Sequence, residues 1–507
     1  MAETKREIER KYDAPDEPFR LPDLRKVPGV EATVPQGVTE LDAVYYDTAD
    51  RRLAAARITL RRRTGGADAG WHLKLPVALS EGVRDEVRAP LTGTAVPRAL
   101  AGLVRSRVRG DALVPVVRLL STRDVTELTG ADGTLLAEVS VDAVRAERAD
   151  GERATAWTEI EVELADGGDP AFLTKVEKRL RKAGVHRSAA SSKLARALAE
   201  TGAAPVPRPA AEDPGTDAGA HVLARLRAQR DALVDLDPDV RRDLPDALHQ
   251  MRVTTRRLRS AFKTYRKLLD PRVTGPLGDE LKWLAGELGI DRDREVLTER
   301  ITGRIDALPR HLLLGPVRGR LRTWAVARRQ GSRRHTVAVL DSKRYLALLD
   351  GLDALLADPP LRRKRAARPA AEVLAEAALR DHARLAAHVE HALALEPGPD
   401  RDLALHEARK AAKRARYAGE TAVPALGKQA RRFARSMKDV QTVLGDHQDS
   451  VVAREALRDL AMQAHAAGEN GFTWGLLHGY EQATAARREA ELPGVWADAA
   501  QPRLAAG

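Results

Sequence analysis

The chain has no cysteine and few aromatic residues. None of its 507 residues is Cys, and Phe, Tyr and Trp together make up 4%. The absence of thiols excludes disulfides and thiolate metal sites, so any metal must be held by oxygen or imidazole ligands. Few aromatics with many Ala, Leu and Arg residues favour helices that pack through small aliphatic side chains and expose basic faces.

Long apolar runs are also missing. The opening segment MAETKREIERK is charged from its third residue, and no stretch approaches the ~20 apolar residues of a membrane-spanning helix. We therefore expect a soluble cytoplasmic protein with no membrane partner. Because the length exceeds the size at which a single core keeps growing, we expect two or more domains.

Basic residues are in excess. The chain has 85 Lys and Arg against 73 Asp and Glu, a formal net charge of +12. Such a balance predicts a polyanionic partner, for which nucleic acid, an anionic membrane and polyphosphate are all candidates.

Two periodicities divide the chain. From residue 5 to about 165, segments such as REIERKY, RITLRRR, GWHLKLP and WTEIEVEL alternate with period two, which predicts antiparallel strands. Two short helical stretches follow, and the Pro- and Ala-rich segment after them predicts a linker. The rest has helical periodicity. We expect a multidomain protein: an N-terminal α+β domain at 1–200, a linker at 201–218, and an all-α domain at 219–495.

The predicted strands each have one ionic face. Glu7, Glu9 and Lys11 alternate in the first strand, and Glu159 and Glu161 alternate in the last, whereas the middle strands carry mostly bases. A solvated face explains any single strand, but not this segregation of acids from bases. A closed barrel with the ionic face inward would bring the two groups together. Carboxylates suit Mg²⁺ or Mn²⁺, and guanidinium forks suit phosphate oxygens.

An ordered set of motifs resembles the CYTH superfamily of triphosphate tunnel metalloenzymes. The set comprises Glu7-x-Glu9-x-Lys11, YYDT at 45–48, LRRR at 60–63, LKLP at 73–76, EIEVEL at 159–164 and SSKLARAL at 191–198. The resemblance implies an eight-stranded antiparallel barrel with flanking helices. It also implies that the barrel binds a triphosphate and Mg²⁺ or Mn²⁺, and that water attacks the terminal phosphoryl group.

The same resemblance implies the site residues. Metal ligands would be Glu7, Glu9, Asp142, Glu159 and Glu161. Phosphate-binding residues would be Lys11, Arg61, Arg63, Lys74, Arg84, Arg123 and Lys193. The catalytic group would comprise Glu7, Glu9 and Lys11.

The helical half contains an internal duplication. LHQMRVTTRRLRS at 248–260 and LHEARKAAKRARY at 405–417 share Leu-His-x-x-Arg and the basic residues after it, and each has a lysine further on. The copies lie 156 or 157 residues apart, which predicts a pair of duplicated helical bundles. In both copies basic residues form one stripe of a helix. For one helix a solvated basic face is the ordinary explanation; the repeat favours a shared anion-binding surface.

This half resembles the CHAD domain, a conserved-histidine α-helical module. The resemblance implies that inorganic polyphosphate binds to the repeated basic helices. The implied contacts are His249, Arg252, Arg256, Arg257, Arg259 and Lys282 in the first copy, and His406, Arg409, Lys413, Arg414, Arg416 and Lys438 in the second. We interpret His447, which has no counterpart in the first copy, as structural.

Two functions remain open at this point. One is a metal-dependent inorganic triphosphatase joined to a polyphosphate-binding domain. The other is a non-catalytic polyphosphate-binding protein whose barrel is silent and whose helices direct it to polyphosphate granules. Nucleic-acid binding is the less favoured third possibility, because aromatics that could stack on bases are nearly absent from the basic faces. The physiological substrate, the metal and the oligomeric state are not determined by the sequence.

Overall fold

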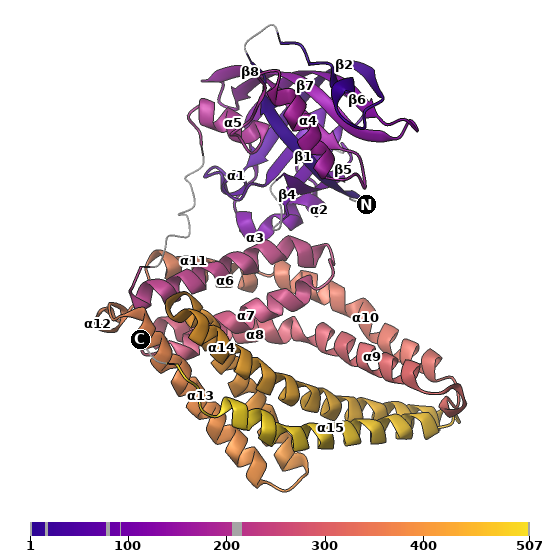
Figure 1. The fold of residues 1–507 in the computed structure, drawn as a ribbon, viewed down its shortest axis with the longest axis vertical. Coiled ribbons are helices and arrows are strands. Elements are labelled where there is room, and N and C mark those ends of the chain that lie inside the picture. The colour runs from indigo at the N-terminus through magenta and orange to yellow at the C-terminus, as the bar shows by residue number, and fades with distance from the viewer. Residues whose placement is uncertain (1–2, 16–18, 78–81, 92, 205–214, 505–507) are drawn as a thin grey trace. The chain divides into compact units, whose positions relative to one another are not determined.

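The chain folds into two compact units, residues 1–210 and 211–507 (Figure 1). The computed structural model describes residues 3–15, 19–77, 82–91, 93–204 and 215–504, excluding the side chains of 290–295 and 326–332. The multidomain prediction is confirmed. The predicted boundaries at 200 and 219 stay a prediction, since much of the linker, 205–214, lies outside the described residues.

The first unit is built on one antiparallel sheet. Its strands are β1 (Glu3–Asp13), β2 (Ala32–Asp47), β3 (Thr59–Thr64), β4 (Gly70–Pro76), β5 (Val83–Ala89), β6 (Val114–Thr129), β7 (Leu135–Arg148), β8 (Ala154–Leu164) and β9 (His186–Arg187). The order is β5-β4-β3-β2-β6-β7-β8-β1-β9, and β1 also pairs with β5. This extra pairing closes eight of the nine strands into a barrel, as expected.

Register places the ionic positions on the inside. Lys11 of β1 lies opposite Glu161 of β8, and Asp142 of β7 lies opposite Glu159 of β8 and Arg123 of β6. Directly opposite residues share a face of the sheet, so these side chains belong to one surface.

Apolar side chains of the intervening positions face the outside, where helices cover them. The covering elements are α1 (Arg52–Ala55), α2 (Arg98–Leu103), α3 (Arg105–Val108) and α4 (Ala171–Arg181). Leu60 and Leu73 pack with Leu100 of α2, and Ile160 and Val162 pack with Val176 of α4. The barrel is therefore apolar outside and ionic inside.

Helix α5 (Lys193–Glu200) packs on the inner face instead. Its Leu194 and Leu198 join a core with Tyr45 and Trp157, which have the strand parity of the ionic residues. The Ser192 hydroxyl accepts a hydrogen bond from the N–H of Ala195 and so caps the helix. Lys193 follows directly as the first residue of α5, which aims it at the barrel interior.

The second unit is helical. Its helices are α6 (Ala218–Arg241), α7 (Ala247–Thr264), α8 (Pro271–Glu287), α9 (Gly289–Ala307), α10 (Val317–Asp341), α11 (Lys343–Ala357), α12 (Arg363–Ala366), α13 (Ala370–Ala394), α14 (Pro399–Ala466) and α15 (Phe472–Ala499). Leucines and alanines dominate its main core, and a smaller core joins α9, α10, α14 and α15. Among the described residues, no helix is both long and apolar enough to cross a membrane.

The duplication corresponds to α7 and the first part of α14. The repeated basic segments, 248–260 and 405–417, lie within these two helices, which pack against each other. Helix α14 kinks at Gly427, whose φ of 52° and ψ of −121° are not helical. The predicted all-α C-terminal architecture is thus confirmed. The first copy of the repeat extends over α7 and α8, whereas the second copy lies within α14, a single bent helix (Figure 1).

Candidate functional site

Three carboxylates converge inside the barrel. We call Asp142, Glu159 and Glu161 the acidic cluster; one oxygen from each lies within 4.8 Å of the others. The Lys193 ammonium lies among them, 2.9 Å from Asp142, 2.7 Å from Glu159 and 2.8 Å from Glu161. A cation held by three carboxylate oxygens is thus already part of the fold.

Two further cations flank the acidic cluster. Arg123 donates two hydrogen bonds to Asp142, at 2.7 and 2.8 Å, and one of 2.7 Å to Glu161. Lys11 pairs with Glu161 and lies 3.1 Å from Glu9. Six of the predicted site residues from β1, β6, β7 and β8, with Lys193 of α5, therefore meet in one place.

A second group of charges lies across the inner face, on β1, β4 and β5. Lys74 is 2.5 Å from Glu7 and 3.9 Å from Glu86, and Arg88 pairs with Glu86 and lies 3.7 Å from Glu7. His72 contacts Glu86 at 3.0 Å. Glu7 thus pairs with cations of neighbouring strands and is not part of the acidic cluster.

Glu86 and His72 are site residues that the sequence analysis did not select. Both are about 1% exposed, and His72 also contacts the Asp68 carbonyl at 2.9 Å. Burial lowers the pKa of His72 to about 4 although Glu86 opposes this, so the ring is neutral at neutral pH. The sequence contains a signal for both residues, because His72 is two positions from Lys74 and Glu86 is two positions from Arg88, which places them on the same faces of β4 and β5.

Burial and charge divide the carboxylates into two kinds. Burial raises the pKa of Glu7 to about 7, and Lys74 only partly offsets it. Burial would also raise the pKa of Glu9, but Lys11 and Lys74 outweigh it and bring the value to about 2. Burial opposes ionisation of Glu161 as well, yet Lys11, Lys193 and Arg123 hold its pKa well below the usual range. At neutral pH the carboxylates of Glu9 and Glu161 are charged.

Arginines of β3 supply the remaining inner cations. Arg61 contacts the Tyr45 hydroxyl at 3.3 Å and lies 4.0 Å from Glu86. Arg63 pairs with Asp68, and burial together with Arg61 and Arg123 lowers its pKa to about 9. Repulsion among these guanidinium groups is what a bound phosphate would relieve.

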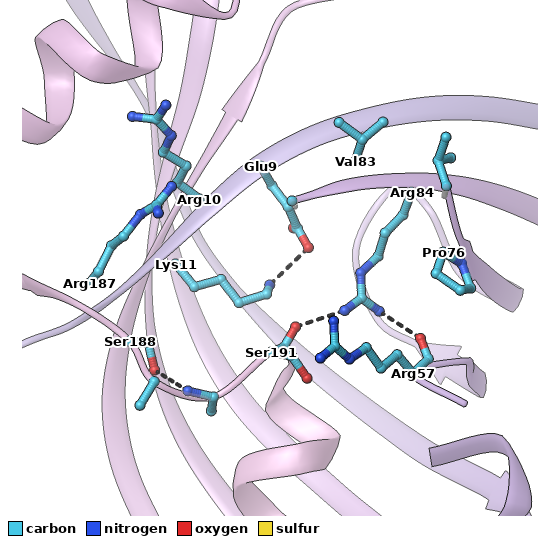
Figure 2. A pocket seen from close by; sticks show the side chains of 14 residues that line it. Glu9, Arg10, Lys11, Arg57, Pro76, Val83, Arg84, Arg187, Ser188 and Ser191 are labelled. Atoms are coloured by element: carbon cyan, nitrogen blue, oxygen red, sulfur yellow. Dashed lines mark hydrogen bonds and ion pairs between the residues drawn. The ribbon is translucent and has the colours of Figure 1, made fainter. Parts of the chain in front are cut away.

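An open pocket of about 650 Å³ gives access from one side of the barrel. Glu9 and Lys11 line it together with Arg57 and Arg84 (Figure 2). Arg84 donates to the Ser191 carbonyl at 2.8 Å and to the Arg57 carbonyl at 3.4 Å, which holds it across the opening. Arg84 is thus at the mouth, whereas Lys74 and Arg123 are half-buried on the inner face.

Some of the predicted basic residues of the helical unit lie close together in the structure. Lys413 of α14 is close enough to Arg256 of α7 and to Arg409 and Arg416 of α14 for these arginines to lower its pKa, after the larger effect of burial, to about 7. Bases from both copies therefore lie together. We call these four residues the basic cluster.

Other predicted contacts are already engaged within the chain. Arg414 pairs with the buried Asp381 at 2.9 Å, and His406 contacts Gln448 at 2.6 Å. The remaining predicted residues differ in burial: Arg252 is buried, His249, Arg257 and Arg259 are half-buried, and Lys282 and Lys438 are exposed.

His447 lies in an ionic network of its own. Its Nε2 is 3.2 Å from both Asp402 and Glu489, and these carboxylates also pair with Arg454 and Arg401. The network joins both parts of α14 to α15 and agrees with a structural role for His447.

The comparisons with known proteins match both units in order. The CYTH domain model matches residues 5–198, and the CHAD domain model matches residues 224–458. The chain is a CYTH–CHAD protein. A relative, the uncharacterized protein MT2285 of Mycobacterium tuberculosis (strain CDC 1551 / Oshkosh), is 39% identical over 96% of this chain and 94% of its own length.

Two solved structures are similar to this CYTH–CHAD protein. PptA from Streptomyces chartreusis is 20% identical with a TM-score of 0.47, covering 56% of this chain and 100% of that one. The CHAD domain from the plant Ricinus communis is 28% identical with a TM-score of 0.45, covering 57% and 93%.

Proposed function

We propose that the CYTH barrel hydrolyses inorganic triphosphate with a bound divalent metal, and that the CHAD domain binds polyphosphate. The observation that carries the enzymatic part is the inner face of the barrel, where the acidic cluster stands beside a set of buried and half-buried cations. CYTH tunnel proteins bind triphosphates and are metal-dependent.

The acidic cluster fits a divalent cation. Its three oxygens already converge on the Lys193 ammonium, so the site is arranged around positive charge. All its donors are carboxylate oxygens, the ligands that Mg²⁺ and Mn²⁺ prefer. Glu9 is ionised and lies on β1, the strand that pairs with β8, so it is a further candidate ligand. A bound metal would stabilise charge on the phosphate oxygens during hydrolysis.

The chain's own cations would hold the triphosphate. Lys74, Arg61 and Arg123 are half-buried on the inner face, and Lys11 connects them to the mouth where Arg84 lies. They would position and neutralise the phosphates while water attacks the terminal phosphorus and pyrophosphate leaves. No covalent nucleophile is required for this reaction.

Phosphate release from tripolyphosphate with Mg²⁺ or Mn²⁺ tests the enzymatic proposal. The Glu9→Gln variant should lose the activity, because Lys11 and the metal lose a charged partner. Unchanged turnover in Glu7→Gln and Glu9→Gln would contradict it. A substrate panel that adds nucleoside triphosphates would identify the preferred triphosphate.

A silent barrel is the second candidate function, and one observation favours it. The chain's own Lys193, Arg123 and Lys11 set three cations against the three carboxylates of the acidic cluster, so the site is charge-compensated without metal or substrate. In that case the protein would only bind polyphosphate and associate with its granules. A silent barrel predicts that the protein binds polyphosphate but hydrolyses no triphosphate with Mg²⁺ or Mn²⁺.

A further inference from the structure

Three guanidinium groups surround a single carboxylate in the helical unit. Glu420 of α14 accepts hydrogen bonds from Arg225 of α6 at 3.2 Å and Arg257 of α7 at 3.0 Å. Its other oxygen lies 3.2 Å from Nε of Arg416, one turn earlier on α14. Helices α6, α7 and α14 thus meet at one acidic side chain.

The charges at this point do not balance. Three guanidinium groups carry three positive charges against one carboxylate, an excess of two. The four side chains are 16–28% exposed, so water screens them incompletely while a solute anion can still reach them. Burial, followed by the neighbouring Arg257, lowers the pKa of Arg225, because both disfavour its positive charge.

Unused hydrogen-bonding groups lie beside Arg225. The buried Oγ of Ser260 and the buried Nε of Arg257 have no hydrogen-bond partner among the described residues, and both residues line a small cavity with Arg225. The cavity volume is about 10 Å³, which accommodates no more than a water molecule. A larger anion that binds the three guanidinium groups would therefore have to take the place of the Glu420 carboxylate between them.

We propose that Arg225, Arg257 and Arg416 form a phosphate subsite that Glu420 occupies until polyphosphate displaces it. The inference rests on the proposed polyphosphate binding. It adds Arg225 as a phosphate contact and Glu420 as a carboxylate that competes with polyphosphate. Carboxylate and phosphate oxygens accept from guanidinium groups in the same way, so one can replace the other. Arg416 also belongs to the basic cluster, which makes the subsite continuous with it. Arg225 lies outside the duplicated motif, which therefore does not predict its role.

The test measures polyphosphate affinity of the full chain in EDTA, which prevents metal-dependent hydrolysis. Glu420→Gln keeps the shape of the side chain but removes the competing charge, so binding should tighten about three- to tenfold. Its matched control, Glu407→Gln, removes an acid that pairs with Lys410 on the same helix and should change affinity less than twofold.

Arginine variants test the same subsite independently. Arg225→Gln should weaken binding about fivefold, whereas Arg227→Gln, on an exposed part of the same helix, should weaken it less than twofold. This pair remains decisive if the Glu420 variant does not fold. Equal effects of the two arginine variants would overturn the subsite.

A purely structural ion pair predicts different results. If Glu420 only ties the three helices together, Glu420→Gln would lower the unfolding temperature and leave affinity unchanged or weaker, which would overturn the proposal. Failure of the wild type and Glu420→Gln alike to bind polyphosphate would instead overturn the proposed binding function and the subsite with it. Binding by the variant alone would support displacement.

Discussion

The barrel interior and the basic cluster of the helical unit differ in charge balance: the barrel pairs its cations with carboxylates, whereas the basic cluster groups cations together. In the barrel, Lys193 touches three carboxylates and Arg123 touches two of them. In the basic cluster, Lys413 is surrounded by arginines, of which Arg409 lies 3.5 Å from Asp449 and Arg416 lies 3.2 Å from Glu420. The barrel is therefore suited to a metal cation together with its anion, whereas the basic cluster can attract a polyanion by itself.

The largest expected effect comes from the centre of the acidic cluster. Glu161→Gln removes the charge that Lys11, Lys193 and Arg123 share, so metal-dependent phosphate release should fall by about 100-fold or more. Polyphosphate affinity of the CHAD domain should not change. The measurement is phosphate release with saturating Mg²⁺ or Mn²⁺.

Glu147→Gln is the control for this variant. Glu147 pairs with Arg145 near the end of β7 and contacts none of the site residues described above. It should keep wild-type turnover. A Glu161→Gln enzyme with full activity would show that the barrel does not use its acidic cluster.

Reversing charge in the basic cluster should give the next largest effect. The double variant Arg256→Glu/Arg409→Glu removes one cation from each copy and adds two acids, so polyphosphate affinity should fall by about 10- to 100-fold at low salt. Triphosphate turnover should stay unchanged, since the changes lie in the other unit. Arg431→Glu, an exposed position further along α14, is the control; an equal loss in it would point to net charge alone.

Lys413 should make polyphosphate binding depend on pH. Burial and the arginines lower its pKa from 10.5 to about 7 in the folded chain, so between these values the unfolded chain holds more protons. Folding stability should accordingly rise with pH across this window. A bound polyanion favours the charged lysine, so affinity should fall about tenfold from pH 7 to pH 9.

Lys413→Gln should flatten this pH dependence. Binding titrations at several pH values and constant ionic strength measure it, with Arg256, Arg409, Arg416 and Asp449 left intact around position 413. An equally steep profile in the variant would assign the pH dependence to another group.

The smallest effects are expected at the exposed lysines of the repeat. Lys282→Gln and Lys438→Gln should each weaken polyphosphate binding about twofold, because water screens exposed charges. Competition binding with long-chain polyphosphate resolves a change of this size. A loss larger than that of Arg256→Glu/Arg409→Glu would place the main contact on these lysines instead.

Much of this organisation could be predicted from local patterns. Alternation along β1 and β8 assigned Glu9, Lys11 and Glu161 to one face, and the repeated Leu-His-x-x-Arg segment identified the duplication. These features depend on periods of two or 3.6 residues, which any strand or helix must obey. They identify which side chains share a face.

Only the tertiary structure decided which charges meet. Closure of the barrel by the β1–β5 pairing brings Lys74 and Arg88 to Glu7, and the packing of α5 on the inner face brings Lys193 to the acidic cluster. Glu420 and Arg225 are likewise far apart in sequence and meet where three helices pack. A local period carries no information on such contacts, because they depend on strand order, helix packing and the desolvation that follows from both.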